Sequence, residues 1–320
     1  MITIRIQILR LLTILITIFC NQAFAQKTKE ILWTTDWSPN GELIAIGGNI
    51  DSLSIYSSNL KLYKSFPVSN TITRIKWHPS INIIGVATQM SSEKSFLINL
   101  DSNEKIDLNG ISPDGARGID WNFTGDYLAV ADNDGQIFIY NINGELIRKF
   151  ENQANSTKGI TAIAWHPKKN ILTTVSDKIR FLDMEGSLLK SVKHRPEDVL
   201  LLSIAWHKSG DFFVTGDYGD EKDKSLLQYW NEQGELLKSI DISKGEYRNL
   251  VWNAKGDRLA SASDALRIWD INGNLISEGN SKDYLWGISW NRKGTRIVTS
   301  SMEQKIILWN KKAKRMKTIE

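Results

Sequence analysis

Seven tryptophans recur along this chain at intervals of 38 to 46 residues, and their spacing constrains the fold more than any other feature of the sequence. A period of 20 to 50 residues is the mark of a repeat architecture, in which each unit is one supersecondary motif that buries its apolar surface against its neighbours. Seven units of about 42 residues account for the chain from residue 26 onward, so no second domain is expected. The repeating tryptophans are Trp37, Trp77, Trp121, Trp165, Trp206, Trp252 and Trp290.

Each unit carries signals for four short strands. An apolar residue stands two positions before the Trp in six units, and a turn with Gly or Pro follows the Trp, as in 38–41. An apolar strand (43–48 in the first unit), an aromatic or β-branched strand (137–140 in the third) and a mixed strand (145–150) complete the pattern. No stretch sustains a helical period of 3.6 residues. The pattern predicts an all-β fold, a seven-bladed β-propeller of four-stranded antiparallel blades.

This pattern resembles the WD-repeat β-propeller family over residues 26–320, the whole predicted mature chain. Its third strands end in pairs similar to the family's Trp-Asp, namely Tyr140-Asn141, Trp230-Asn231, Trp269-Asp270 and Trp309-Asn310. The resemblance also implies an Asp in the turn between the second and third strands, where Asp132, Asp177, Asp217 and Asp264 stand. The family's Gly-His pair is absent from every unit. We therefore expect its buried Asp–His–Ser–Trp hydrogen-bond network not to form as usual, and the blades to depend more on apolar packing.

The two ends of the repeat array indicate how the ring closes. Residues 314–320 align with 145–151, the outer strand of the third unit, so the seventh blade is expected to supply its own outer strand. We therefore predict a ring closed by packing of the seventh blade against the first. An N-terminal segment paired as the outer strand of the seventh blade would contradict this prediction.

Residues 1–25 have the layout of a secretory signal peptide. Arg5 and Arg10 flank an apolar stretch that runs to Phe19, and Ala23 and Ala25 occupy the small-residue positions of a cleavage site. We expect export to the periplasm or the extracellular space and no integral membrane span after cleavage; the alternative is an uncleaved membrane anchor. Cleavage would also remove Cys20, the only cysteine.

Composition limits the possible partners. The 40 Lys and Arg residues against 36 Asp and Glu give a formal net charge of +4, which falls to +2 without the first 25 residues. So small a charge gives no reason to expect nucleic acid or an anionic membrane as a partner. The abundance of Ile, Asn and Lys points to a bacterial source.

The sequence offers little material for catalysis. His78, His166 and His207 each follow a repeating Trp, where other units have Ser or Asn, and we expect them to bond the turn backbone. His194 is expected to be a solvated loop residue. The acidic run 217–223 is interpreted as a solvated hairpin tip rather than a calcium site, because lysines interrupt it. No catalytic or dinucleotide motif occurs. We expect no enzymatic activity, no metal and no cofactor.

Side chains at the innermost strand ends are the candidate binding residues. In the WD-repeat family, positions near the fourth residue before the Trp lie at the top rim, where partners dock; here that position varies between units. Aromatic residues and Arg make up binding hot spots. Ring closure makes blades six, seven and one neighbours. The alternative is that the two extra tryptophans pack between blades. The candidate partner-binding residues are Trp33, Trp286, Tyr284, Arg248, Tyr247 and Arg117.

These observations favour a non-enzymatic protein-interaction platform that acts as a monomer and binds a protein partner. The alternative is a propeller with a small-ligand or hydrolytic site in its central channel. The lining of that channel discriminates between them. Converging carboxylates or histidines would favour the ligand or enzyme site, and apolar and small residues would favour the platform.

Overall fold

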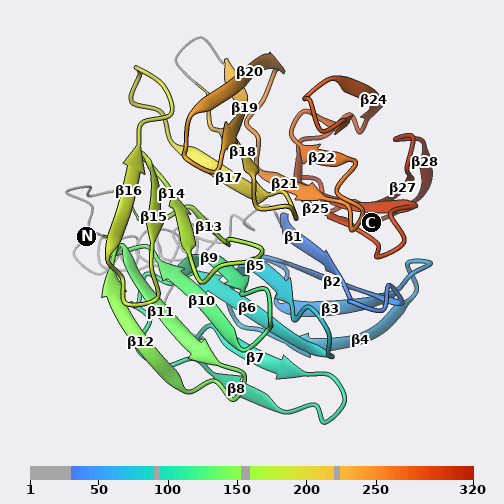
Figure 1. Ribbon diagram of the computed structural model, residues 1–320. Coiled ribbons are helices and arrows are strands. Elements are labelled where there is room, and N and C mark those ends of the chain that lie inside the picture. The colour runs from blue at the N-terminus through green and yellow to red at the C-terminus, as the bar shows by residue number, and fades with distance from the viewer. Residues whose placement is uncertain (1–29, 90–93, 153–158, 220–223) are drawn as a thin grey trace, which may run out of the picture. The chain divides into compact units, whose positions relative to one another are not determined.

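Seven antiparallel four-stranded sheets make up the described part of the chain. The computed structural model describes residues 30–89, 94–152, 159–219 and 224–320, and residues 31–320 form one compact unit. In every sheet the strands follow chain order from the inside outward, β1-β2-β3-β4 being the first. The predicted seven-bladed propeller of four-stranded blades is confirmed (Figure 1).

The strand bounds repeat the same scheme in each blade. The innermost strands are β1 (Leu32–Trp37), β5 (Thr71–Trp77), β9 (Ala116–Trp121), β13 (Ala162–Trp165), β17 (Leu201–Trp206), β21 (Asn249–Trp252) and β25 (Leu285–Trp290). The second strands are β2 (Leu43–Gly48), β6 (Ile83–Gln89), β10 (Tyr127–Asp132), β14 (Leu172–Val175), β18 (Phe212–Asp217), β22 (Leu259–Ala262) and β26 (Arg296–Ser301).

The outer half of each blade holds the remaining two strands. The third strands are β3 (Ser52–Ser57), β7 (Phe96–Asn99), β11 (Gln136–Asn141), β15 (Ile179–Leu182), β19 (Ser225–Asn231), β23 (Ala265–Trp269) and β27 (Ile306–Asn310). The outermost strands are β4 (Leu62–Pro67), β8 (Lys105–Asp107), β12 (Leu146–Glu151), β16 (Leu188–Val192), β20 (Leu236–Ser243), β24 (Leu275–Asn280) and β28 (Arg315–Ile319). Every repeating tryptophan ends an innermost strand, as the spacing predicts.

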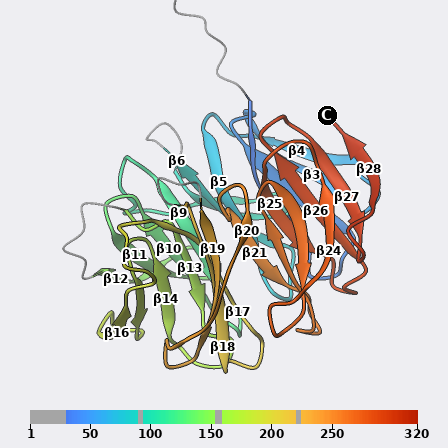
Figure 2. The ribbon, with the colours of Figure 1, turned by 90° about the horizontal axis from the view of Figure 1, so that it is seen from above.

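The ring closes where β25 of the seventh blade lies beside β1 of the first (Figures 1 and 2). Within the described residues, the outer strand of the seventh blade is β28, from the C-terminal end of the chain, and no N-terminal strand joins that sheet. One apolar cluster spans the two blades and includes Ile44, Val298 and Leu308. The prediction that packing of the seventh blade against the first closes the ring is confirmed.

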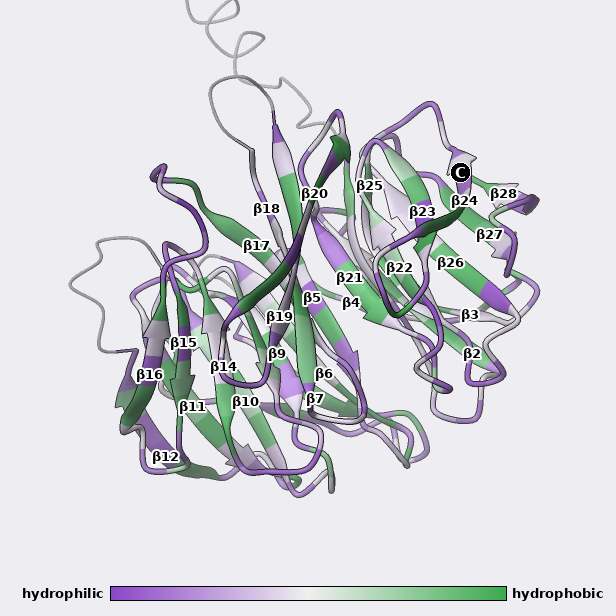
Figure 3. Cartoon of the chain, turned by 45° about the horizontal axis from the view of Figure 1, so that its top comes forward, coloured by the Kyte–Doolittle hydropathy of each residue, from purple (hydrophilic) through white to green (hydrophobic). Residues whose placement is uncertain are grey.

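The hydrophobic core is divided into clusters that lie largely between neighbouring blades. The largest joins the first and second blades, where Leu53 and Ile55 meet Trp77 and Phe96, all fully or almost fully buried. In Figure 3 apolar segments run along the strands, and the connecting loops are mostly polar. Each blade therefore buries its apolar faces only by stacking on its neighbours, as expected for a repeat fold.

Of the hydrogen-bond network that the WD-repeat resemblance implies, the bond from the Trp to a Ser or Thr hydroxyl is present in three blades. The indole Nε1 of Trp230, Trp269 and Trp309 donates to a Ser or Thr hydroxyl on the adjacent second strand at 2.8 to 2.9 Å. In two blades an arginine on the third strand pairs with the turn aspartate. Arg180 pairs with Asp177 through two contacts of 2.9 and 3.2 Å, and Arg267 pairs with Asp264 through two of 2.7 and 3.1 Å.

The expectation that apolar packing replaces the polar network is therefore incomplete. The blade arginines Arg180 and Arg267 are only 4% exposed, and each forms two charge-assisted hydrogen bonds to its turn aspartate. The family motif does not reveal these pairs, because the arginine stands three residues after the Asp, whereas the expected histidine precedes the first strand.

The three turn histidines lie where the repeat predicts and bond the turn backbone. The Nδ1 atom of His78 accepts from the backbone N–H of Ser80 at 3.1 Å, and its Nε2 lies 3.0 Å from the carbonyl oxygen of Gly125 in the next blade. A Cβ on Gly125 would lie only 2.3 Å from that Nε2, and the φ of Gly125 is +84°, so this turn requires glycine. His166 and His207 make the equivalent contacts to Gly210 and Gly256.

The prediction for His194 is wrong. Its side chain is only 3% exposed, because the connector between the fourth and fifth blades folds over the third strand β19, where Gln228 Nε2 donates to the His194 carbonyl at 3.1 Å. Among the described residues, neither ring nitrogen has a hydrogen-bond partner. Burial, with the positive charge of Arg195, lowers the pKa of His194 to about 4.

The predicted signal peptide and its membrane-anchor alternative lie outside the described residues. In the part of the chain that the structure describes, no helix is long and apolar enough to cross a membrane.

Candidate functional site at the upper mouth of the channel

The residues four positions before the repeating tryptophans converge at one end of the central channel. Together with Arg74 they line a cavity of about 40 Å³ that we call the upper mouth. All seven blades contribute one such residue, and the upper mouth is therefore a site that only a closed ring can assemble. These mouth residues are Trp33, Thr73, Arg117, Thr161, Leu202, Arg248 and Trp286.

Local strand geometry explains why these side chains reach the upper mouth. In five blades the register between the first and second strands shifts across this residue, as at Trp33, Arg117 and Trp286. The bulged residue is left without a partner in the ladder, and a bulge re-aims a side chain away from the alternation of the strand. In the other two blades the innermost strand begins just after Thr161 and Arg248.

Two tryptophans and two arginines form one contiguous cluster there. The rings of Trp33 and Trp286 meet edge to face, with centroids 4.8 Å apart and an interplanar angle of 88°. The guanidinium carbon of Arg248 lies 4.2 Å from the Trp286 ring centroid, and that of Arg117 lies 5.8 Å from the Trp33 ring centroid. Both distances allow cation–π attraction. The predicted arc of blades six, seven and one is thus present, and it extends to the third blade.

Arg74, three residues before Trp77, completes the cluster and was not predicted. Its guanidinium lines the upper mouth and also the cavity below it. Burial, reinforced by the positive charges of Arg248 and Arg117, lowers the pKa of Arg74 to about 10. A sequence signal exists, because the equivalent position holds Thr34, Gly118, Ala162, Ser203, Asn249 and Gly287 in the other blades, none of them charged.

The structure separates the two tyrosines from this cluster. Tyr284 is 46% exposed in the loop before β25, so it stands on the same end of the propeller but does not line the upper mouth. Tyr247 is completely buried in an apolar cluster with Val214 and Trp269. Its ring cannot meet a partner, and its assignment as a binding residue is corrected. It directly precedes Arg248, and its side chain points into the inter-blade core instead of the channel.

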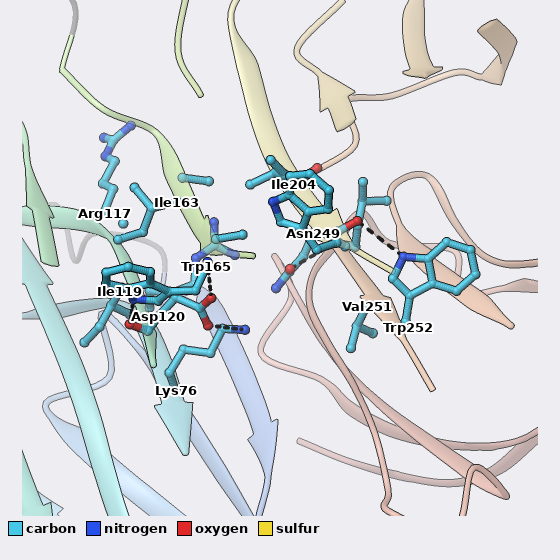
Figure 4. A pocket seen from close by; sticks show the side chains of 18 of the residues that line it. Lys76, Arg117, Ile119, Asp120, Ile163, Trp165, Ile204, Asn249, Val251 and Trp252 are labelled. Atoms are coloured by element: carbon cyan, nitrogen blue, oxygen red, sulfur yellow. Dashed lines mark hydrogen bonds and ion pairs between the residues drawn. The ribbon is translucent and has the colours of Figure 1, made fainter. Parts of the chain in front are cut away.

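Below the upper mouth the channel opens into a cavity of about 250 Å³ (Figure 4). Asp120 is the one carboxylate among its lining residues. One oxygen of Asp120 accepts from the backbone N–H of Trp165 at 2.9 Å, and the other lies 3.3 Å from Lys76 Nζ. The Asp120 charge raises the pKa of Lys76. Both charged groups are therefore engaged in joining blades.

Apart from Arg74, Arg117, Ser203 and Asn249, the rest of this lining is apolar or small. Ile163, Ala164, Ala205 and Val251 face the cavity, and no histidine is among its lining residues. Trp252 and Trp165 each donate an indole N–H to a backbone carbonyl of the preceding blade, at 3.3 and 3.2 Å. By the criterion set out from the sequence, the channel lining favours a platform over a ligand or hydrolytic site.

The described residues contain no group of three or more His, Cys, Asp or Glu side chains that could hold a metal ion. Asp217, at the start of the acidic run, is fully buried. It accepts from the backbone N–H groups of Gly219 and Leu226 and lies 3.0 Å from Arg195 Nη1. Residues 220–223 of that run lie outside the described residues.

Comparisons with known proteins point to one kind of repeat. Residues 119–208 match the family described as the anaphase-promoting complex subunit 4 WD40 domain, and residues 273–310 match the WD domain, G-beta repeat. A chain in the crystal structure of the mitotic checkpoint complex superposes with a TM-score of 0.73 over 87% of this chain and 86% of that one, at 14% sequence identity. That similarity concerns the fold alone.

Curated relatives match over parts of their length. The intraflagellar transport protein 122 homolog of Mus musculus is 25% identical over 234 residues, which cover 71% of this chain and 18% of the relative. The F-box-like/WD repeat-containing protein TBL1X of Macaca fascicularis is 35% identical over 176 residues, which cover 49% of this chain and 31% of the relative. The chain thus spans less than a third of the length of these relatives.

Proposed function

Because the chain belongs to the WD-repeat β-propeller family, we propose that it is a non-enzymatic platform that binds another protein over the upper mouth of its channel. The observation that carries the proposal is the convergence of Trp33, Trp286, Arg117 and Arg248 on one end of the ring. Trp and Arg are the residues that most often dominate the binding energy of protein interfaces.

The architecture suits the rigid presentation of side chains to a protein partner rather than catalysis. The mouth residues sit on innermost strands, or directly before them, and the opposite ends of these strands are fixed by inter-blade hydrogen bonds, such as that from Trp121 Nε1 to the Lys76 carbonyl at 3.2 Å. A rigid scaffold reduces the entropy lost when a partner binds. Tyr284, exposed beside the upper mouth, can extend the contact area. The family that matches residues 119–208 is described as the WD40 domain of an anaphase-promoting complex subunit, which is by its name part of an assembly.

The channel cavity supports the alternative of a small ligand less well. Ligand pockets usually measure about 300 to 1,000 Å³ and hold a few converging polar groups. The cavity here measures about 250 Å³, and its Asp120 and Lys76 are already paired. A low-molecular-weight compound that stays bound through purification, detected by native mass spectrometry, would favour this alternative over the platform.

Substitution at the upper mouth tests the platform. The half-buried Trp33 is changed to Ala, and Leu189, which is 54% exposed on the outer strand β16, is changed to Ala as a matched control. Both variants and the parent are crosslinked in the native cell and their partners identified by mass spectrometry. We expect a partner captured by the parent and by Leu189→Ala to be lost with Trp33→Ala, at a melting temperature within a few degrees of the parent. Equal capture by all three proteins, or a loss explained by unfolding of Trp33→Ala, would refute the upper mouth as the binding site.

The proposal extends to location and assembly. The pattern of residues 1–25 supports export to a periplasm or the extracellular space, with Gln26 as the first residue of the mature chain. N-terminal sequencing of the protein from the periplasm or medium checks this. A chain that begins at Met1 in the membrane fraction would favour the uncleaved anchor. We propose a monomer, which light scattering of the purified protein checks.

A further inference from the structure

Three arginines meet at the upper mouth, and their combined positive charge indicates which kind of ligand binds there. Arg74, Arg117 and Arg248 come from the second, third and sixth blades and line the same cavity of about 40 Å³. No acidic side chain is among its lining residues. Like charges brought together in a partly buried site repel one another unless a counter-charge is present.

Two of the three guanidiniums lack a carboxylate partner. Arg248 pairs with Glu246, which belongs to its own connector. No described residue forms an ion pair or a side-chain hydrogen bond with Arg74 or Arg117. The Nε atom of Arg117 is buried and has no acceptor among the described residues. Burial lowers the pKa of both groups, and neighbouring arginines lower it further. Both arginines are half-buried, and charges withdrawn from water in proteins are normally paired, so this pair of arginines indicates a missing anion.

The aromatic rings hold the arginines without using their hydrogen-bond donors. Trp286 and Trp33 contact Arg248 and Arg117 by cation–π attraction. This arrangement leaves N–H groups available for oxygen atoms of a ligand. The fork of a guanidinium matches the two oxygens of a planar carboxylate.

The small volume limits what can enter. About 40 Å³ is close to the share of one water molecule in the liquid, about 30 Å³. A single carboxylate fits such a space, whereas a nucleotide or a sugar is far larger. The rest of the ligand must therefore remain outside, over the rim, as the backbone of a polypeptide would.

We propose that the upper mouth binds an acidic peptide segment of the partner, with a carboxylate inserted between Arg74, Arg117 and Arg248 and the segment lying over Trp33 and Trp286. This inference rests on the proposed function, because it names the chemistry of the partner at the same site. The arginines supply charge and orientation, and the tryptophans supply apolar contact.

Peptide binding by the purified protein tests the inference. The probe is a fluorescently labelled peptide with three consecutive glutamates, compared with the same peptide carrying glutamines, a version with one phosphoserine, inorganic phosphate and a thymidine oligonucleotide. The variants are Arg74→Gln, Arg117→Gln and Arg117→Lys. The control is Arg258→Gln, a half-buried arginine in the turn at the opposite end of the sixth blade.

We expect the glutamate peptide to bind the parent at least about tenfold more tightly than the glutamine peptide, because hydrogen bonds to charged groups contribute about 1.5 to 3 kcal/mol. Arg74→Gln and Arg117→Gln should each abolish most of this preference, Arg117→Lys should retain part of it, and Arg258→Gln should leave it unchanged. Added salt should weaken binding of the glutamate peptide.

Other outcomes overturn the inference. Equal affinity for the glutamate and glutamine peptides would show that charge is not recognised. Binding of the phosphoserine peptide alone would assign the anion to a phosphorylated side chain, and binding of the oligonucleotide or of inorganic phosphate in preference to the peptides would exclude a peptide carboxylate.

Melting temperatures distinguish a variant that has lost binding from one that has lost stability. Removing an unpaired charge that faces two like charges should leave the melting temperature of Arg74→Gln unchanged or higher than that of the parent. A marked fall would show that Arg74 is structural. If the crosslinked partner of the parent is still captured by Arg74→Gln and Arg117→Gln, the platform stands and only the acidic segment is refuted.

Discussion

At the residue scale, burial decides the charge state of the histidines. His78 and His166 are 4% and 2% exposed, and burial lowers the pKa of both below the ordinary value of 6.5. For each of these two histidines, hydrogen bonds from the ring to two turns offset the cost of burial. His194 is buried to the same degree without such bonds, so its neutral state is an energetic requirement of the folded chain.

His194 makes stability depend on pH in the acidic range. Its pKa is about 4 in the folded chain and about 6.5 when unfolded. Below pH 6.5 the unfolded state therefore binds a proton that the folded state does not, and stability falls as the pH drops towards 4 and levels off below it. The difference of about 2.5 pH units corresponds to a loss on the order of 3 kcal/mol.

The variant His194→Met isolates this effect. Methionine fills a similar volume without buried nitrogens, so we expect unchanged or higher stability at pH 7.5 and a shallower fall between pH 6.5 and 4. Urea unfolding of parent and variant at several pH values measures both. The half-buried His207 bonds two turns, and His207→Met serves as the comparison. Parallel pH profiles for parent and His194→Met would contradict the assignment.

At the element scale, an ion pair fastens the connector between the fourth and fifth blades to the turn between β18 and β19. Arg195 Nη1 lies 3.0 Å from Asp217 Oδ2, and the two residues are 8% and 0% exposed. Asp217 also caps the turn through its other carboxylate oxygen. Removing one member of a buried pair leaves the other charge uncompensated, which typically costs about 3 to 5 kcal/mol.

A double-mutant cycle measures this pair. We expect Arg195→Met to destabilise the protein by about 3 kcal/mol, and Arg195→Met with Asp217→Asn to destabilise it less than the sum of the single changes, because asparagine keeps an oxygen for the turn and carries no charge. Urea unfolding at pH 7 gives the four free energies. Additive losses would mean that the pair is not coupled.

The strands are predicted from the sequence, whereas the packing of the connectors between blades is not. Trp spacing and turn residues predict all seven blades, and the outer strand β28 lies where alignment with the third unit placed it. Four mouth residues, Trp33, Arg117, Arg248 and Trp286, are predicted because their position is counted from the Trp. The burial of Tyr247 and His194 is not predicted, because it depends on how connectors fold over the next blade. The arginine pairs of Arg180 and Arg267 are missed because a charged residue in a strand is normally assigned to the surface.

At the scale of the whole molecule, the seven blade interfaces are not equivalent. Six are bridged by the chain itself, and the interface of the seventh blade with the first is held by non-covalent contacts alone. Those contacts centre on Ser289, whose hydroxyl accepts from the backbone N–H of Trp37 at 3.1 Å and donates to Asp36 at 2.8 Å. Arg292 and Lys317 of the seventh blade add hydrogen bonds to Pro39 and Asn59.

This asymmetry predicts that the ring opens first between β25 and β1. Opening at any other interface leaves the two blades tethered, whereas opening here releases both ends of the ring, and such local openings are what native-state hydrogen exchange reports. Ser289→Ala removes two hydrogen bonds, one buried and one partly buried, and should cost on the order of 1 to 2 kcal/mol. Ser203→Ala, which removes the bond from Ser203 to the Tyr247 carbonyl at 2.7 Å between the fifth and sixth blades, is the matched control.

We expect Ser289→Ala to accelerate amide exchange in β1 and β25 more than in β9 and β13, and Ser203→Ala to accelerate exchange only around its own interface. Because Trp33 and Trp286 sit on β1 and β25, opening there would also take apart the upper mouth. Binding of any ligand at the upper mouth should therefore slow exchange in β1 and β25 of the parent. Uniform exchange across all seven interfaces in Ser289→Ala would show that the closure is no weaker than the tethered interfaces.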